Sequence, residues 1–119
     1  MKRFTIYVFL AVIVLFCISA CGQKTPTATV KAYYNAIEKN DAKALERNAT
    51  SEVVAMWAMY SSKAQGMLLE RGKPTGFSER ITGNTAVVTV TFANGERETE
   101  HLVKDGGKWK VTMPPDGGK

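Results

Sequence analysis

The ten residues AVVTVTFANG, at positions 86–95, decide the fold class of this chain. Apolar residues at the even positions from 86 to 92 alternate with valine and threonine at the odd positions. This period of two residues indicates a strand with one buried face. Asn94-Gly95 follows, and this dipeptide is the strongest short-range signal for a hairpin. The stretch therefore predicts an antiparallel strand that ends in a tight turn.

Three further segments show a strand-like alternation and are bounded by turn residues. They are residues 77–82, 96–104 and 108–113, with turns at Gly83-Asn84 and Asp105-Gly106-Gly107. The second of these is polar apart from Leu102 and Val103. In the third, Trp109 shares a face with Val111, so we expect Trp109 to be a core residue. The C-terminal half thus predicts a four-stranded antiparallel meander.

The segment before these strands has helical rather than strand periodicity. Thr25 and Pro26 are typical of an N-cap and a first helical position. The apolar face of this helix has the spacing i, i+3, i+4, i+7, and its members are Val30, Tyr33, Tyr34 and Ile37. A short helix over 42–48 with Asp41 as its cap follows, and a third runs from Thr50-Ser51 to about Leu69. Helices followed by strands predict an α+β fold with the helices packed on one face of the sheet.

The N-terminus has the pattern of a secretory signal. Lys2 and Arg3 precede an uncharged stretch over 4–16, and Ile18-Ser19-Ala20-Cys21 closes it. The closing run resembles the lipobox of bacterial lipoproteins. That resemblance implies that residues 1–20 are removed and that Cys21 carries a lipid, which anchors the protein to a membrane of the cell envelope on the extracytoplasmic side.

A retained membrane helix is the alternative interpretation. Phe4 to Ala20 is 17 residues, at the short end of the roughly 20 that cross a bilayer. In the lipoprotein interpretation, Gly22 stands where an aspartate favours the inner membrane, so in a Gram-negative host we expect the outer membrane. The predicted division is a signal peptide over 1–20, a lipidated tether over 21–26, one domain over 27–113 and a flexible tail over 114–119.

The charges are scattered along the chain. The formal net charge is +5, of which Lys2 and Arg3 contribute two. Lys108 and Lys110 flank Trp109, but one such pair is not the footprint of a nucleic-acid site, so we expect no nucleic-acid partner. We expect these charges mainly to form a solvated surface, and a weak attraction of the anchored domain to anionic lipid headgroups is the functional alternative.

Two segments together carry a family resemblance. One is Ala28–Ile37 followed by Asn40-Asp41, and the other is Ile81–Val88, continuing through Asn94-Gly95 to Gly107-Lys108-Trp109-Lys110-Val111. Over residues 25–113 the chain resembles small bacterial lipoproteins of the DUF4878 type, within the NTF2-like (cystatin-like) superfamily. The resemblance implies a cone in which helices lie against a curved four-stranded antiparallel sheet, preceded by the signal helix. It implies no defined activity.

Few side chains point to chemistry. His101 is the only histidine, so neither a metal site nor a serine–histidine–aspartate set is indicated, and we expect no metal and no cofactor. Glu98 and Glu100 lie on the polar strand, and we expect them to be solvated. Several large side chains are candidates to line a pocket inside the cone. They are Tyr33, Tyr34, Met56, Trp57, Tyr60 and Phe92.

Two functions remain open from the sequence. The favoured hypothesis is non-catalytic binding of a small apolar ligand or an envelope protein partner at the membrane. The alternative is a small enzyme of isomerase or hydrolase type that uses the cone cavity. A large closed pocket with a buried carboxylate would favour the enzyme, and a filled cone or an exposed apolar surface would favour binding.

Replacing Cys21 with alanine tests the lipoprotein interpretation. We expect Cys21→Ala to remain an unprocessed precursor without lipid, because the thiol is the only site of attachment in the lipobox. Metabolic labelling with a fatty-acid analogue measures this. Equal labelling of Cys21→Ala and the wild type would contradict the interpretation.

Overall fold

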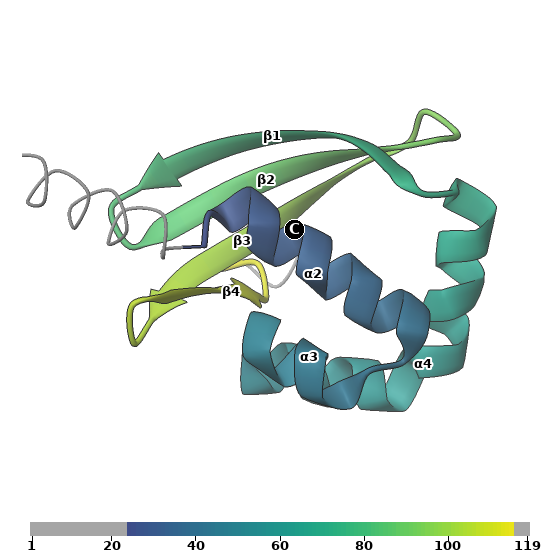
Figure 1. The fold of residues 1–119 in the computed structure, drawn as a ribbon, viewed down its shortest axis with the longest axis horizontal. Helices are drawn as coiled ribbons and strands as arrows, with labels where there is room; N and C mark the ends of the chain where they lie inside the picture. Colours follow the sequence, from purple (N-terminus) through teal and green to yellow (C-terminus); the bar gives the residue numbers. More distant parts are fainter. Residues whose placement is uncertain (1–23, 116–119) are drawn as a thin grey trace, which may run out of the picture.

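Helices precede strands in the computed structural model, which describes residues 24–115 (Figure 1). The helices are α2 (Pro26–Lys39), α3 (Ala42–Asn48) and α4 (Ser51–Arg71). The strands are β1 (Pro74–Thr82), β2 (Thr85–Phe92), β3 (Arg97–Asp105) and β4 (Lys108–Thr112). The predicted α+β order is confirmed. The predicted signal peptide, Cys21 and the last residues of the tail lie outside the described residues.

The first two helices begin and end where the sequence predicts. The Thr25 side chain accepts a hydrogen bond from the Ala28 N–H at 3.1 Å, which caps α2 at its start. Asn40 has a left-handed backbone with a φ of 53° and ends that helix. The Asp41 side chain then caps α3 by accepting from the Ala44 N–H at 3.1 Å.

Helix α4 is longer than predicted and is kinked. It continues past Leu69 to Arg71, and Tyr60 interrupts it with non-helical backbone angles. Gly72 ends the helix with a φ of 79° and donates its N–H to the Leu68 carbonyl. A side chain at Gly72 would place its Cβ 2.8 Å from that of Ala93, so both the backbone angle and the close approach require glycine there.

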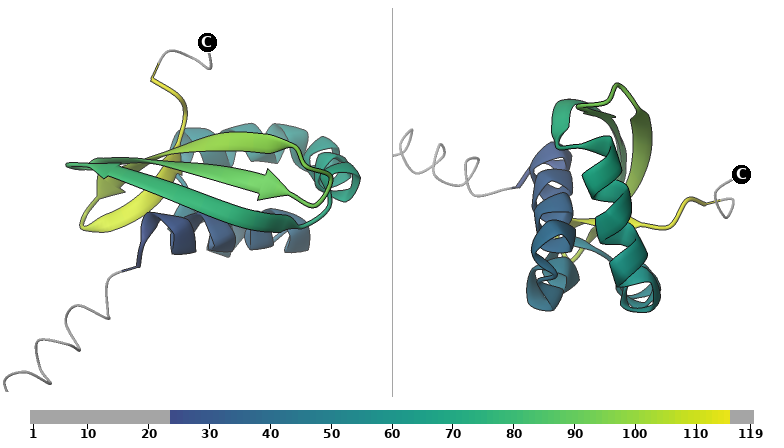
Figure 2. Two further views of the ribbon diagram at one scale, coloured as in Figure 1. Left: turned by 90° about the horizontal axis from the view of Figure 1, so that it is seen from above. Right: turned by 90° about the vertical axis from the view of Figure 1, so that its right-hand side faces the viewer.

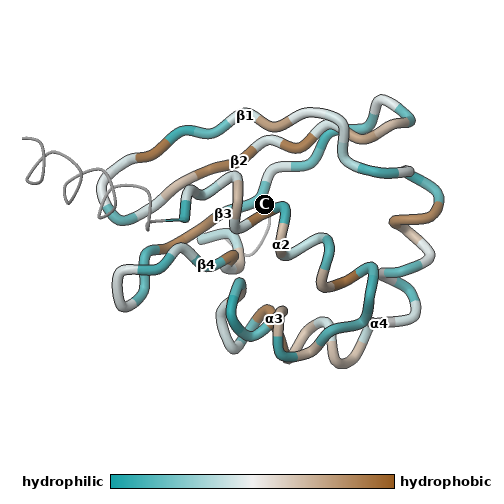
Figure 3. Tube along the Cα trace, in the orientation of Figure 1, coloured by the Kyte–Doolittle hydropathy of each residue, from teal (hydrophilic) through white to brown (hydrophobic). Residues whose placement is uncertain are grey.

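The four strands form an antiparallel sheet in the order β1-β2-β3-β4. Ala86 pairs with Leu102, which in turn pairs with Val111, so these three side chains share one face. On β2, the even positions from 86 to 92 are buried and the odd positions are more exposed, as predicted. Figure 3 shows the hydrophobic positions that result along β2 and β3.

The helices all lie on one side of this sheet (Figure 2). Val30, Tyr33 and Ile37 of α2 are buried with the inner face of β2 in a single core cluster. The parallel bridge from Ala49 to Val111 joins the segment between α3 and α4 to the last strand. Within residues 24–115 no helix has the length and apolarity needed to cross a bilayer.

Trp109 tests the register of β4. Its exposed fraction is 8%, so the predicted core position is confirmed. We expect Trp109→Ala to lower the free energy of unfolding by about 3–5 kcal/mol, since it removes a large buried aromatic side chain. Lys108→Ala, at the exposed neighbouring position, serves as the control and should change it by less than ~0.5 kcal/mol. Urea unfolding of both variants measures the difference, and equal values would contradict the register.

Candidate functional site

Two carboxylates lie on the inner face of β3. Glu98 pairs with Val90 and Glu100 with Val88, and both valines belong to the core. Paired residues point to the same face of a sheet, so both carboxylates face the helices. The Glu98 side chain keeps 41% of its surface exposed, whereas Glu100 is half-buried. The prediction of solvated glutamates is therefore wrong for Glu100.

Glu100 is held by a tyrosine from the first helix. The Tyr34 hydroxyl donates a hydrogen bond to Glu100 Oε1 at 2.6 Å. Burial raises the pKa of the Glu100 carboxyl to about 7, although the Tyr34 hydrogen bond favours the ionised form. The neighbouring Glu98 also raises this pKa, and Arg71 lowers it. Glu100 consequently exchanges its proton near neutral pH.

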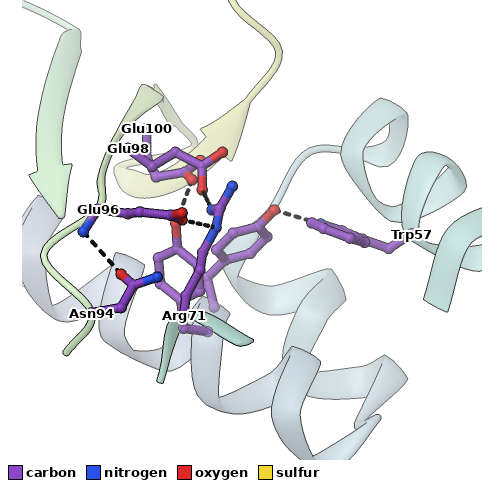
Figure 4. A network of polar contacts seen from close by, with 8 residues as sticks. Trp57, Arg71, Asn94, Glu96, Glu98 and Glu100 are labelled. Atoms are coloured by element: carbon purple, nitrogen blue, oxygen red, sulfur yellow. Dashed lines mark hydrogen bonds and ion pairs between the residues drawn. The ribbon is translucent and has the colours of Figure 1, made fainter. Parts of the chain in front are cut away.

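Arg71 links the end of α4 to β3. Its Nε lies 3.0 Å from Glu96 Oε2, and its Nη1 pairs with Glu98 Oε2 (Figure 4). The guanidinium also lies over the Phe92 ring, 5.4 Å from the ring centroid. Burial lowers the pKa of Arg71, but the two glutamates raise it by more, so the net effect is a raised pKa. The cluster therefore joins the last turn of α4 to β2 and β3, the two central strands of the sheet.

Aromatic side chains occupy the space beneath the sheet. Trp57 donates its ring N–H to the Tyr33 hydroxyl. The Tyr33 and Tyr34 rings meet edge to face with centroids 5.3 Å apart, and Tyr34 meets Phe92 in the same way at 5.6 Å. Burial raises the pKa of both tyrosines, so their hydroxyls stay protonated. The inside of the cone is thus packed with side chains.

The candidate pocket residues fall into three environments. Tyr33, Tyr34 and Phe92 are in the core. Trp57 lines a small hollow of about 140 Å³ together with Ile37 and residues of α3 and α4. The other two candidates lie on α4 outside the core, Met56 half-buried and Tyr60 with 52% of its surface exposed at the kink. The structure brings four of the six candidates together, around the polar cluster.

A larger groove lies between α2, the end of α4 and the start of β1. Its volume is about 780 Å³. We call it the α4–β1 groove, and its apolar lining is Tyr34, Leu68, Leu69 and Phe77. Leu69 has 85% of its surface exposed, so the groove opens at the molecular surface. Figure 3 shows a hydrophobic segment at this end of α4.

Sequence analysis did not identify this groove. Leu68 lay in the third predicted helix and Phe77 in the first predicted strand, but no motif joins them. Their proximity depends on the sharp connection through Gly72. The available signal was Leu69, an apolar residue at the end of the third predicted helix.

His101 points away from this region. It pairs with Val87 on the outer face of the sheet, opposite to Glu100, and is half-buried there. Within the described part of the chain, no three histidine, cysteine, aspartate or glutamate side chains lie close enough together to hold a metal ion.

Comparison with solved structures identifies the fold. The chain is similar to the crystal structure of a Campylobacter jejuni protein described as an NTF2-like transpeptidase, with a TM-score of 0.55 and 16% sequence identity. The alignment covers 76% of this chain and 100% of that one. The described domain therefore has an NTF2-like fold. No protein-family model and no curated protein sequence matches the chain.

The raised pKa of Glu100 predicts a pH-dependent stability. Between its ordinary value of 4.5 and about 7, the folded state keeps a proton that the unfolded state releases. Stability attributable to Glu100 is therefore present at low pH, falls as the pH rises through this window and levels off above it. We expect the free energy of unfolding to fall by about 1–3 kcal/mol more in the wild type than in Glu100→Gln over this range.

Urea unfolding from pH 4.5 to 8 measures this difference. Tyr34→Phe provides a second check, because it removes the hydrogen bond that favours ionised Glu100. It should move the midpoint of the pH-dependent fall in stability to higher pH. If the free energy of unfolding changes with pH in the same way in the wild type and in Glu100→Gln, Glu100 is solvated and the prediction is wrong.

Proposed function

We propose that this protein is a membrane-anchored binding protein of the cell envelope. In this proposal a lipid on Cys21 attaches it to the membrane, and the α4–β1 groove takes the chain of an anionic amphiphile such as a fatty acid. The signal-like N-terminus supports the attachment. The single observation that carries the binding function is the groove itself.

The size and lining of the groove support an apolar ligand. Ligand pockets commonly measure about 300–1,000 Å³ and have mostly apolar walls with a few polar groups. The groove volume of about 780 Å³ falls within this range. Leu68, Leu69 and Phe77 supply apolar contacts from two different elements. A hydrocarbon chain matches this lining better than a polar ligand does.

The charges around the groove favour an anionic end group. Lys31 lies over the Phe77 ring, with its Nζ 5.1 Å from the ring centroid, and Lys73 lies at the start of β1. Glu38 is the carboxylate among the lining residues. Two cations against one carboxylate favour a carboxylate or phosphate on the ligand.

An acid–base enzyme is the second candidate, and the specific observation in its favour is Glu100. A pKa of about 7 suits a group that transfers protons at neutral pH. However, Glu100 accepts its hydrogen bond from Tyr34 and is not among the residues that line the groove. We therefore favour a binding function over a catalytic one.

Two exposed residues of α4 form a matched pair for testing the groove. Leu69 lines it with 85% of its surface exposed, and Met59 lies outside it with 77% exposed. A photoreactive dodecanoate is cross-linked to the full chain in neutral nanodiscs. We expect Leu69→Glu to reduce saturable cross-linking at least about tenfold, because it places a negative charge in the apolar lining, and Met59→Glu to leave it unchanged.

Two outcomes would contradict the binding function. One is cross-linking that unlabelled dodecanoate fails to compete, and the other is an equal loss in both variants. Glu100→Gln should cross-link as the wild type does. Thermal unfolding by circular dichroism confirms that each variant is folded.

A further inference from the structure

Another hollow, with a volume of about 850 Å³, lies beside α3 and the β3–β4 turn, near the start of α2. It is lined by residues of α3, by the β3–β4 turn and the first residues of β4, and by Lys24, which precedes α2. Five of the residues that line it are cationic, and Glu46 is the single acidic residue among them. We call these five the basic face: Lys24, Lys43, Arg47, Lys108 and Lys110.

Among residues 24–115, no ion pair neutralises the positive charge of the basic face. Within residues 24–115 both ion pairs use Arg71, which lies at the C-terminal end of α4. Lys24 donates a hydrogen bond from Nζ to Asn48 Oδ1 at 2.6 Å, so its head is held at α3. Burial and then the nearby Arg47 lower the pKa of Lys24. Like charges brought this close together attract an external anion.

Covalent connection places this face near the N-terminal segment. Lys24 follows Cys21 by three residues, which span at most about 11 Å when fully extended. Figures 1 and 2 show the β3–β4 turn at the same end of the domain as the start of α2. Either a lipid on Cys21 or a retained apolar helix before it would therefore hold the basic face close to a membrane.

We propose that the basic face docks on the anionic headgroups of the membrane that holds the N-terminus. This rests on the membrane attachment in the proposed function, but not on the groove. A charged surface of this kind needs an anionic partner within about one Debye length, and a tethered bilayer supplies one. The end of α4 lies at the other end of the sheet, so docking leaves the α4–β1 groove accessible from the aqueous side (Figure 1).

Lysine footprinting on the full chain tests this docking. The protein is reconstituted in nanodiscs of neutral lipid and in nanodiscs with about 30% anionic lipid. Its lysine amines are acetylated, and the extent of acetylation at each lysine is measured by mass spectrometry. We expect acetylation of Lys43 and Lys108 to fall at least about threefold in the anionic nanodiscs and to recover in ~0.5 M salt. Lys39 and Lys63, which are exposed elsewhere, are internal controls and should be unchanged.

A pair of charge-reversal variants distinguishes the effect of the basic face on docking from the effect of the protein's net charge. Lys43→Glu combined with Lys108→Glu should abolish the anion-dependent protection of Lys24. Lys39→Glu combined with Lys63→Glu makes the same change in net charge and should leave that protection intact. All four positions are exposed, so neither variant disturbs the core.

The outcomes distinguish the face from the anchor. A chain that stays on neutral nanodiscs but shows the same footprint on both lipids would overturn the basic face while keeping the anchor. A chain that leaves neutral nanodiscs and binds only anionic ones would support the face and contradict the anchor. Equal protection by soluble glycerol phosphate would assign the hollow to a small anion and overturn membrane docking.

Discussion

The packing of the inner face of β2 against α2 is the constraint on which the rest of the structure depends. Val88, Val90 and Phe92 are almost completely buried, as is Val30 on the helix. Each such side chain contributes about 1.5–3 kcal/mol relative to an exposed one. Because side chains alternate along a strand, a slip of one residue would expose this whole set. The register of β2 is therefore strongly specified, and through pairing it determines which faces of β1 and β3 point inward.

That register explains why acidic side chains lie on the core side of the sheet. Glu100 pairs with Val88 and accepts a hydrogen bond from Tyr34, which lies on the helix that packs against the same face. Glu98 stands one pair further along, where Arg71 neutralises it. The same arrangement fills the cone with aromatic rings, and the open apolar surface is found instead at the end of α4. This is why we propose the groove, and not the inside of the cone, as the binding site.

Sequence reasoning reached the α+β fold, the order of the elements and the core position of Trp109, because alternation, caps and turn residues act locally. The period of two residues also places Glu98 and Glu100 on the same face of their strand as Leu102. Since Leu102 is a core residue, this placement already implied that the two acids face inward, but the polar composition of the strand argued for solvation. The groove could not be predicted in this way. It depends on how the turn at Gly72 brings the end of α4 beside β1.

The assignment of the α4–β1 groove as a ligand site is the central claim, and hydrogen exchange tests it most directly. Exchange of the backbone amides is followed by mass spectrometry on the full chain, with and without dodecanoate. The account predicts that the ligand slows exchange at the end of α4 and the start of β1, over residues 65–77, and leaves α3 and the β3–β4 turn unchanged. Protection centred on the Tyr60 kink, or no ligand-dependent protection at all, would contradict it.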